Sequence, residues 1–264
     1  MSLVAQGIEL PGRILLDELH IKKGSCTVVC GPNGSGKSSL LRVLSGVDLS
    51  PAGRVFIEEK DVALMSPLER AAYIAWLPQR STIFSAWTVE ALVACCRYRF
   101  SESQALALEQ AVKLLHEHGL EHLIGRLSSE ISGGELQRVL IVSLVAQQAQ
   151  FLMLDEPANH LDPKHQINAY QTLGKLWHKG HGLIIVSHDI RLAQLLGDAD
   201  QIQIVGIKDG RLNFQMAFSD PKLERALSQL YDVPFVPRDL PGALAVHLRA
   251  GALAELNKQT GQSE

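Results

Sequence analysis

Residues 31–38 read Gly31-Pro32-Asn33-Gly34-Ser35-Gly36-Lys37-Ser38, which fits the phosphate-binding pattern G-x-x-x-x-G-K-[ST]. This loop directly follows an apolar run at residues 26–30 and directly precedes an amphipathic run that begins at Ser39. Its glycines let backbone N–H groups turn inward around phosphate oxygens, and the following helix adds its positive N-terminal end. A simple glycine turn is the alternative, but the flanking strand and helix patterns favour a phosphate site.

Two side chains of this loop suit particular tasks at a nucleotide. Lys37 can supply a cation to the β- and γ-phosphates, and the hydroxyl group of Ser38 can ligate Mg²⁺. We therefore treat residues 31–39 as candidate binding residues.

A second apolar run, at residues 151–154, ends in the acids Asp155 and Glu156. The end of a strand is where an α/β sheet places its ligand groups. Asp155 would hold Mg²⁺, directly or through water, and Glu156 could accept a proton from an attacking water, a role worth about 10²- to 10⁴-fold in rate. Alone, the pair could equally be a solvated turn or a helix cap. Beside a phosphate loop, the catalytic interpretation is favoured.

A third feature is Ser132-Gly133-Gly134-Glu135, at the start of a helical pattern that continues to residue 148. Ser132 can cap the helix, and the two glycines allow a phosphate to approach its free N–H groups. Taken by itself, this segment is more simply a capped helix.

The chain as a whole alternates short apolar runs with longer amphipathic stretches, which predicts an α/β fold. We expect central strands at residues 26–30 and 182–186, because these runs lack polar alternation. Further strands are expected at residues 54–57, 74–77, 151–154 and 201–205. A hairpin at residues 202–214, turning at Asp209-Gly210, is expected at an edge of the sheet. Residues 237–264 are expected to form a helix followed by a frayed tail.

Composition narrows the function classes. The 264 residues include 46% hydrophobic residues, typical of a folded chain, and the net charge of −3 argues against a nucleic-acid partner. The first residues lack the cationic start of a signal peptide, and no apolar run approaches the roughly 20 residues that cross a bilayer. We expect a cytosolic protein that reaches a membrane only through a partner.

Cysteines and histidines do not predict a metal site. The four cysteines are Cys26, Cys30, Cys95 and Cys96. They lie on apolar segments without CxxC spacing, so buried structural thiols are favoured. Three histidines lie close in sequence, at His116, His118 and His122. Their spacing does not bring all three to one helix face, so a solvated or mixed face is favoured.

The order of these motifs resembles that of an ABC-transporter ATPase over residues 24–214. The ordered set is the phosphate loop, Gln79, Ser132 to Glu135, Asp155-Glu156, Asn159-His160-Leu161-Asp162 and Ser187-His188-Asp189. The resemblance implies a P-loop NTPase (RecA-like) core sheet with an antiparallel β edge and an inserted helical subdomain at about 88–148. It implies one ATPase domain over residues 1–236, and residues 237–264 as a C-terminal extension with no assigned role.

The resemblance also implies ATP and Mg²⁺ as ligands and a role for each motif. Glu156 would be the catalytic base, Lys37 the phosphate-binding lysine and His188 the switch histidine on the γ-phosphate. Gln79 would sense Mg²⁺ and contact the permease. Asp162 would lie in the loop that communicates between subunits.

Partners follow from the same resemblance. In the family, nucleotide is sandwiched between the phosphate loop of one subunit and the Ser-Gly-Gly segment of another, and this chain has one copy of each. A homodimer is therefore implied, bound to transmembrane permease subunits on the cytoplasmic face of the inner membrane. An external substrate-binding protein would act indirectly.

Some segments resemble the ATPases of iron-siderophore, haem and cobalamin importers. They are Leu77-Pro78-Gln79, residues 88–93 with Arg97, Asn159 to Asp162, and Tyr231-Asp232-Val233-Pro234. Phe84 and Trp87, beside Gln79, would fill either a permease contact or the core. The chain departs from the usual pattern at residues 95–100, where Gly-Arg-x-Pro-His is expected.

Two further departures concern the nucleotide. The signature has Ile131 and Glu135 in place of Leu and Gln, and Glu135 adds negative charge near a phosphate site. No aromatic residue precedes Cys30 to stack on adenine. The alternatives are a non-transport ABC ATPase, a regulatory ATP-binding subunit and a small-molecule kinase, of which the kinase leaves the Ser-Gly-Gly segment unexplained.

Overall fold

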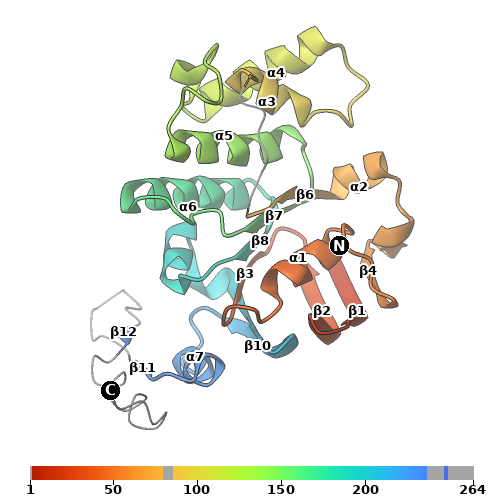
Figure 1. Cartoon of the computed structure of the whole chain (residues 1–264), viewed down its shortest axis with the longest axis vertical. Helices are drawn as coiled ribbons and strands as arrows, with labels where there is room; N and C mark the ends of the chain where they lie inside the picture. The colour runs from red at the N-terminus through yellow and green to blue at the C-terminus, as the bar shows by residue number, and fades with distance from the viewer. Residues whose placement is uncertain (1, 80–85, 237–246, 249–264) are drawn as a thin grey trace, which may run out of the picture.

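The structure, a computed structural model, describes residues 2–79, 86–236 and 247–248. Its main sheet has ten strands in the order β5-β4-β1-β2-β10-β9-β3-β8-β7-β6 (Figure 1). The strands are β1 (Ser2–Leu10), β2 (Ile14–Lys22), β3 (Cys26–Cys30), β4 (Ala52–Ile57), β5 (Lys60–Asp61), β6 (Ile74–Leu77), β7 (Phe151–Asp155), β8 (Gly182–Val186), β9 (Ile202–Lys208), β10 (Arg211–Ala217), β11 (Phe235–Val236) and β12 (His247–Leu248). The helices are α1 (Lys37–Leu44), α2 (Pro67–Tyr73), α3 (Val89–Cys95), α4 (Gln104–Glu117), α5 (Gly133–Ala146), α6 (Pro163–His178) and α7 (Leu223–Tyr231).

The parallel half of the sheet positions the candidate site. Strand β3 pairs in parallel with β8 and β9, and β7 pairs in parallel with β8 and β6. Every residue of β3, β7 and β8 is buried, as their uninterrupted apolar runs predict. Because the strands are parallel, the loops after β3, β7 and β8 emerge at one edge of the sheet.

The antiparallel half differs from the sequence expectation. It is formed by β1, β2, β4 and β5, and it includes two long strands that the sequence analysis did not predict. The β9–β10 hairpin forms as expected, but it does not lie at an edge. Strand β10 pairs with β2 through Arg211 and Leu15, so the hairpin joins the two halves of the sheet. The edge prediction for the hairpin was wrong because β1 and β2 extend the sheet beyond it.

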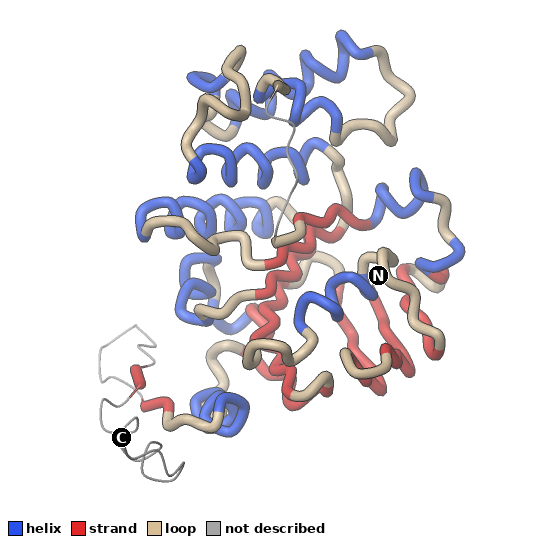
Figure 2. The backbone as a smooth tube through the Cα atoms, viewed as in Figure 1, coloured by secondary structure: helices blue, strands red, loops and turns tan. Residues whose placement is uncertain are grey.

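Helices α3, α4 and α5 form a separate layer above the strands. In Figure 2 this part of the molecule is helix and loop, whereas the strands gather below it. The layer has its own apolar core, to which Val89, Val93, Leu115, Val139 and Val142 contribute. Helix α5 also packs against α6, which covers the sheet. The helical layer is thus attached to the sheet mainly through α5.

The chain after the hairpin returns to the sheet through α7. Leu223, Leu227 and Leu230 are fully buried against the sheet, on the same side as α6. Beyond α7, β11 pairs with β12. The helix expected over residues 237–264 falls mostly outside the described residues, and the two described ones, His247 and Leu248, form a strand. Among the described residues, no helix combines the length and apolarity needed to span a membrane.

Candidate active site

The phosphate loop joins β3 to α1 and is shaped by glycine. Gly31 and Gly36 have φ of 151° and 99°. A Cβ on Gly31 would collide with the carbonyl group of Ile207, and a Cβ on Gly36 with that of Arg13. Side chains are therefore excluded where the loop passes closest to its neighbours.

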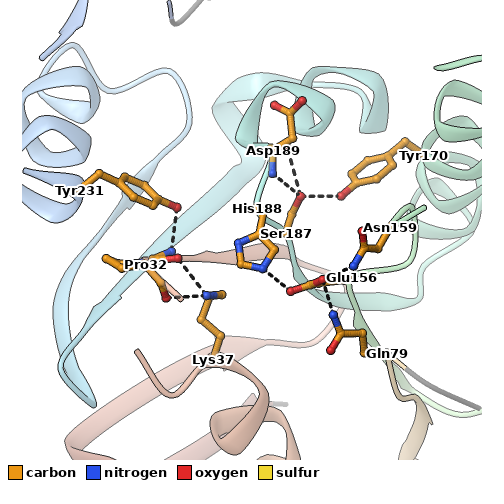
Figure 3. Close-up of polar contacts among 11 residues, drawn as sticks. Pro32, Lys37, Gln79, Glu156, Asn159, Tyr170, Ser187, His188, Asp189 and Tyr231 are labelled. Atoms are coloured by element: carbon orange, nitrogen blue, oxygen red, sulfur yellow. Dashed lines mark hydrogen bonds and ion pairs between the residues drawn. The ribbon is translucent and has the colours of Figure 1, made fainter. Parts of the chain in front are cut away.

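Lys37 is buried and bonded to its own loop. Its Nζ atom donates to the carbonyl oxygens of Gly31 and Pro32 at 2.9 and 2.8 Å (Figure 3). Burial lowers the pKa of Lys37, and the nearby charge of Glu156 opposes this shift. The lysine is thus a desolvated cation with two carbonyl partners at the start of the loop.

Glu156 is the meeting point of several predicted residues. It follows β7 with a left-handed φ of 52°, and its side chain is 8% exposed. Its Oε2 atom accepts from Gln79 Nε2 at 2.6 Å and from Asn159 Nδ2 at 2.8 Å, and its Oε1 atom contacts His188 Nε2 (Figure 3). The structure therefore brings Gln79 and His188, from two distant segments, together with Asn159 of the same loop at one carboxylate.

Asp155, the last residue of β7, has donor chemistry that suits a metal ion. Its Oδ1 atom is buried without a hydrogen-bond partner. Burial raises the pKa of Asp155, while a hydrogen bond with the Ser38 side chain opposes the shift. An unpartnered carboxylate oxygen beside a hydroxyl group fits Mg²⁺, which binds one or two carboxylates together with phosphates and water.

A cleft of about 370 Å³ opens in front of these residues. The sequence-predicted residues that line it are Asn33, Gly34, Gly36, Lys37, Ser38, Ser39, Gln79, Glu156 and His188. Gly12 and Arg13, in the β1–β2 turn, also line it and were not predicted. The sequence signal for them is the turn at Pro11-Gly12, which was missed because neither β1 nor β2 was predicted. The lining residues include no aromatic side chain.

The loop after β8 is held by a second layer of hydrogen bonds. Ser187 Oγ accepts from Tyr170 Oη at 3.0 Å and from the Asp189 backbone N–H at 3.2 Å. Tyr170 is fully buried on α6. These contacts fix the backbone that carries His188, and Tyr170 was missed because nothing local in the sequence links it to Ser187.

The Ser132 segment begins α5 and lies in the helical layer. Ser132 and Glu135 form a capping box, in which Glu135 Oε2 accepts from Ser132 N and Oγ at 2.9 and 2.8 Å. His122 Nε2 lies 3.5 Å from Glu135 Oε1. The Ser132 bonds and His122 lower the pKa of Glu135. None of residues 132–135 lines the cleft of the same chain.

Asp162 caps the next helix, α6. Its carboxylate accepts from the His165 backbone N–H at 2.9 Å and contacts His165 Nδ1 at 2.8 Å. The ring of His165 in turn lies against Gly134, where a Cβ would collide with it. The Asp162 loop and the Ser132 segment are therefore neighbours.

A sequence profile described as ABC transporter matches residues 17–159, which include the phosphate loop and both acids. The chain belongs to the ABC transporter family. It is an ATP-binding and ATP-hydrolysing subunit, as the sequence predicted. The expected α/β fold is also confirmed.

Two relatives of this ABC ATPase match most of its length. It is 30% identical to the petrobactin import ATP-binding protein of Bacillus subtilis, over 84% of this chain and 88% of the relative. It is 35% identical to the hemin import ATP-binding protein of Bordetella pertussis, over 80% of this chain and 85% of the relative. A dimeric ATP-binding cassette in a post-hydrolysis state, bound to ADP and Pi, shares the fold with a TM-score of 0.69 and 24% identity, over 82% of this chain and 98% of that one.

The remaining sequence predictions for this ABC ATPase have mixed outcomes. Cys26 and Cys30 are buried as predicted, but Cys95 is exposed. The buried positions of α3 fall at Val89, Leu92 and Val93, a spacing that leaves Cys95 on the outer face. Phe84 lies outside the described residues, and Trp87 is 38% exposed.

The three histidines form a mixed surface, as predicted. His116 and His122 are exposed, and His118 is partly buried. Within residues 2–79 and 86–236, no group of three histidine, cysteine, aspartate or glutamate side chains lies close enough together to hold a metal ion.

Proposed function

We propose that this ABC ATPase powers the import of a metal chelate of the iron-siderophore, haem or cobalamin type. The substrate class is supported by the petrobactin and hemin import relatives, which match at least 80% of the chain. The geometry adds the catalytic assignment. The single observation that carries it is the convergence of Gln79, Asn159 and His188 on the Glu156 carboxylate beside the cleft.

In this proposal ATP binds in the cleft through the phosphate loop. The carbonyl partners of Lys37 are exchanged for phosphate oxygens, because a cation gains more from phosphate than from neutral carbonyl groups. Ser38, Gln79 and Asp155 would hold Mg²⁺, which supplies charge neutralisation for the phosphates. The unpartnered Oδ1 atom of Asp155 supports this assignment.

Glu156 is proposed as the general base. Water attacks the γ-phosphorus, its proton passes to the Glu156 carboxylate, and ADP is the leaving group. His188 Nε2 contacts that carboxylate in the structure. Movement of His188 onto the γ-phosphate would free Oε1 to accept the proton, so ATP itself would release the base.

The complete site is proposed to need a second copy of the chain. Residues 132–135 do not line the cleft of their own chain, yet they offer a helix start that can bind an anion. A partner's Ser132, Gly133 and Gly134 would cover the γ-phosphate, so ATP would close the dimer and hydrolysis would let it open. Asp162, beside Gly134 through His165, would report this closure across the interface.

The proposed partners beyond the second copy are transmembrane permease subunits, with an external substrate-binding protein acting indirectly. The chain would then sit peripherally on the cytoplasmic face of the inner membrane. Gln79 is the proposed connection to the permease, since its amide group reaches Glu156 directly.

The substrate class can be tested by uptake in cells. A host strain that lacks this chain would be supplied with radiolabelled iron-siderophore, hemin or cobalamin, and then complemented with wild type or Glu156→Gln. We expect uptake of one of these chelates to be lost, restored by wild type and not restored by the variant. Unchanged uptake of all three would contradict the substrate class.

A further inference from the structure

The phosphate loop is bonded to the last residue of α7. The Gly31 backbone N–H donates to Tyr231 Oη at 2.9 Å, across 200 residues of sequence (Figure 3). Figure 3 shows Tyr231 and Lys37 on opposite sides of the loop segment that carries Pro32. The contact therefore ties the end of the ATPase fold to the start of the phosphate loop.

Tyr231 supplies the acceptor that the Gly31 N–H group uses in the structure. The residue is buried, and the Ile207 carbonyl group lies against its Cα atom, where no side chain fits. A buried N–H group without a partner costs about 1–3 kcal/mol. The Tyr231 hydroxyl group satisfies it.

Gly31 connects Tyr231 to Lys37 through two hydrogen bonds. Gly31 donates its N–H to Tyr231, and its carbonyl oxygen accepts from Lys37 Nζ at 2.9 Å. Gly31 is thus held at both of its backbone polar groups, on one side by α7 and on the other by the residue that binds phosphate.

Tyr231 is itself fixed in place. Leu227 and Leu230 bury the helix against the sheet, and the Tyr231 ring packs against Phe235 with centroids 5.6 Å apart. The next residue, Asp232, pairs with Lys208 Nζ at 2.7 Å, one residue beyond Ile207. The Tyr231 hydroxyl group is therefore held next to the end of β9, whose Ile207 carbonyl group lies against Gly31.

The contact does not titrate near neutral pH. Burial raises the pKa of Tyr231 well above its ordinary value, and burial raises that of the neighbouring Cys30 to about 12. Both groups remain neutral, so the hydroxyl group acts as a constant hydrogen-bond partner.

We propose that Tyr231 is a positioning residue for the phosphate loop. Its hydroxyl group holds Gly31, and through Gly31 the entrance to the Lys37 site, so that α7 sets the affinity for ATP. The role rests on the proposed binding of phosphate by Lys37. When ATP displaces Lys37 from the Gly31 carbonyl group, the bond from Gly31 N–H to Tyr231 remains and keeps the loop in shape.

The test is Tyr231→Phe in the full chain, which removes the hydroxyl group and keeps the ring. We expect the KM for ATP to rise about ten-fold, the loss expected for one unsatisfied buried donor. We expect kcat to stay within about two-fold, and amide hydrogen exchange at Gly31 to accelerate in the absence of nucleotide. Tyr98→Phe, at an exposed tyrosine in the helical layer, is the matched control and should change neither quantity.

A second variant separates the hydroxyl group from the packing. Phe235→Leu removes the ring contact and keeps the hydroxyl group, so it should lower thermal stability and leave the KM for ATP unchanged. A wild-type KM and unchanged Gly31 exchange in Tyr231→Phe would overturn the proposal, as would an equal rise of KM in Phe235→Leu. If the wild-type chain hydrolyses no ATP, the proposed function fails, and Gly31 exchange alone decides the role of Tyr231.

Discussion

The Glu156 carboxylate contacts His188 Nε2 at the edge of the cleft, and each residue comes from the loop that follows one of two neighbouring parallel strands. Glu156 is nearly buried, whereas the His188 side chain is 45% exposed. The histidine can therefore swing toward a ligand while the carboxylate stays in place. This asymmetry suits a base that is held until nucleotide arrives.

Loss of His188 should slow the chemical step more than binding. We expect His188→Ala to reduce kcat by at least about 100-fold, the range of a positioned proton-transfer or charge-stabilising group. The KM for ATP should change by less than about five-fold, because Lys37 and the loop amides remain. Steady-state phosphate release measures both. His116→Ala, an exposed histidine on α4, is the control, and equal activity of the two variants would contradict the switch role.

Asp155 should lower stability when no ligand is bound. Its pKa is raised by burial, so the folded state holds the proton more tightly than the unfolded state. The loss of stability caused by ionising Asp155 is absent below its unfolded pKa, near 3.9. It grows as the pH rises toward the pKa of Asp155 in the folded protein. We expect Asp155→Asn to raise Tm at pH 7.5 by about 2–4 °C, and by less at pH 5.

Ligand should reverse this difference. With ATP and Mg²⁺ present, wild type should gain more in Tm than Asp155→Asn, because the carboxylate then has a cation partner. Differential scanning calorimetry at both pH values checks the pair of effects. A variant that is less stable than wild type under every condition would show that the carboxylate is not strained by burial.

The negative charge of Glu135 should matter for folding more than for turnover. The capping box and His122 lower the pKa of Glu135, so its stabilising effect is present above the unfolded value and is lost as pH falls through the folded one. Glu135→Ala should lower the free energy of unfolding by about 0.5–1.5 kcal/mol at pH 7, the usual net contribution of a hydrogen bond. Urea unfolding at pH 7 and pH 3.5 measures this difference, which should be smaller at the lower pH.

The matched variant Glu135→Gln tests the effect on nucleotide. Glutamine keeps a capping side chain and removes the charge, so we expect ATP turnover within about two-fold of wild type. A large gain in turnover would show that the charge does repel phosphate, as the departure from the family signature first indicates.

Cys95 should be the most reactive of the four cysteines. It is exposed, and a hydrogen bond with Cys96 lowers its pKa, whereas burial raises that of Cys26 and Cys30 to about 12. Alkylation at pH 8 should therefore label Cys95 first, as mass spectrometry of the digested protein would show. The Cys95→Ser variant should lose the fast phase, and rapid labelling of Cys26 would contradict the buried core.

The parts of the site that could be predicted from the sequence are motifs made of consecutive residues. The phosphate loop, the acids after β7 and His188 after β8 each follow an apolar strand, and parallel pairing necessarily brings such loop ends together. The central strands were predictable for the same reason, since full burial leaves an uninterrupted apolar run.

The parts that could not be predicted depend on contacts between distant segments. Tyr231 and Gly31 are joined across 200 residues, and no local pattern marks the tyrosine as a partner of the loop. Strand β1 was missed because its alternation breaks at a bulge around Gly7, and β2 because Asp17 and Glu18 interrupt it. Without these strands the sequence placed the hairpin at the edge of the sheet, and Arg13, which lines the cleft, had no predicted position.

The most direct test of the paired ATPase site is Glu156→Gln with ATP and Mg²⁺, measured by phosphate release and by light scattering. Turnover should fall by about 10²- to 10⁴-fold. The mass should double from 28.9 kDa only when ATP is present, because the trapped nucleotide holds two copies together. Equal hydrolysis by wild type and variant, with both monomeric in ATP, would contradict the base assignment and the composite site together.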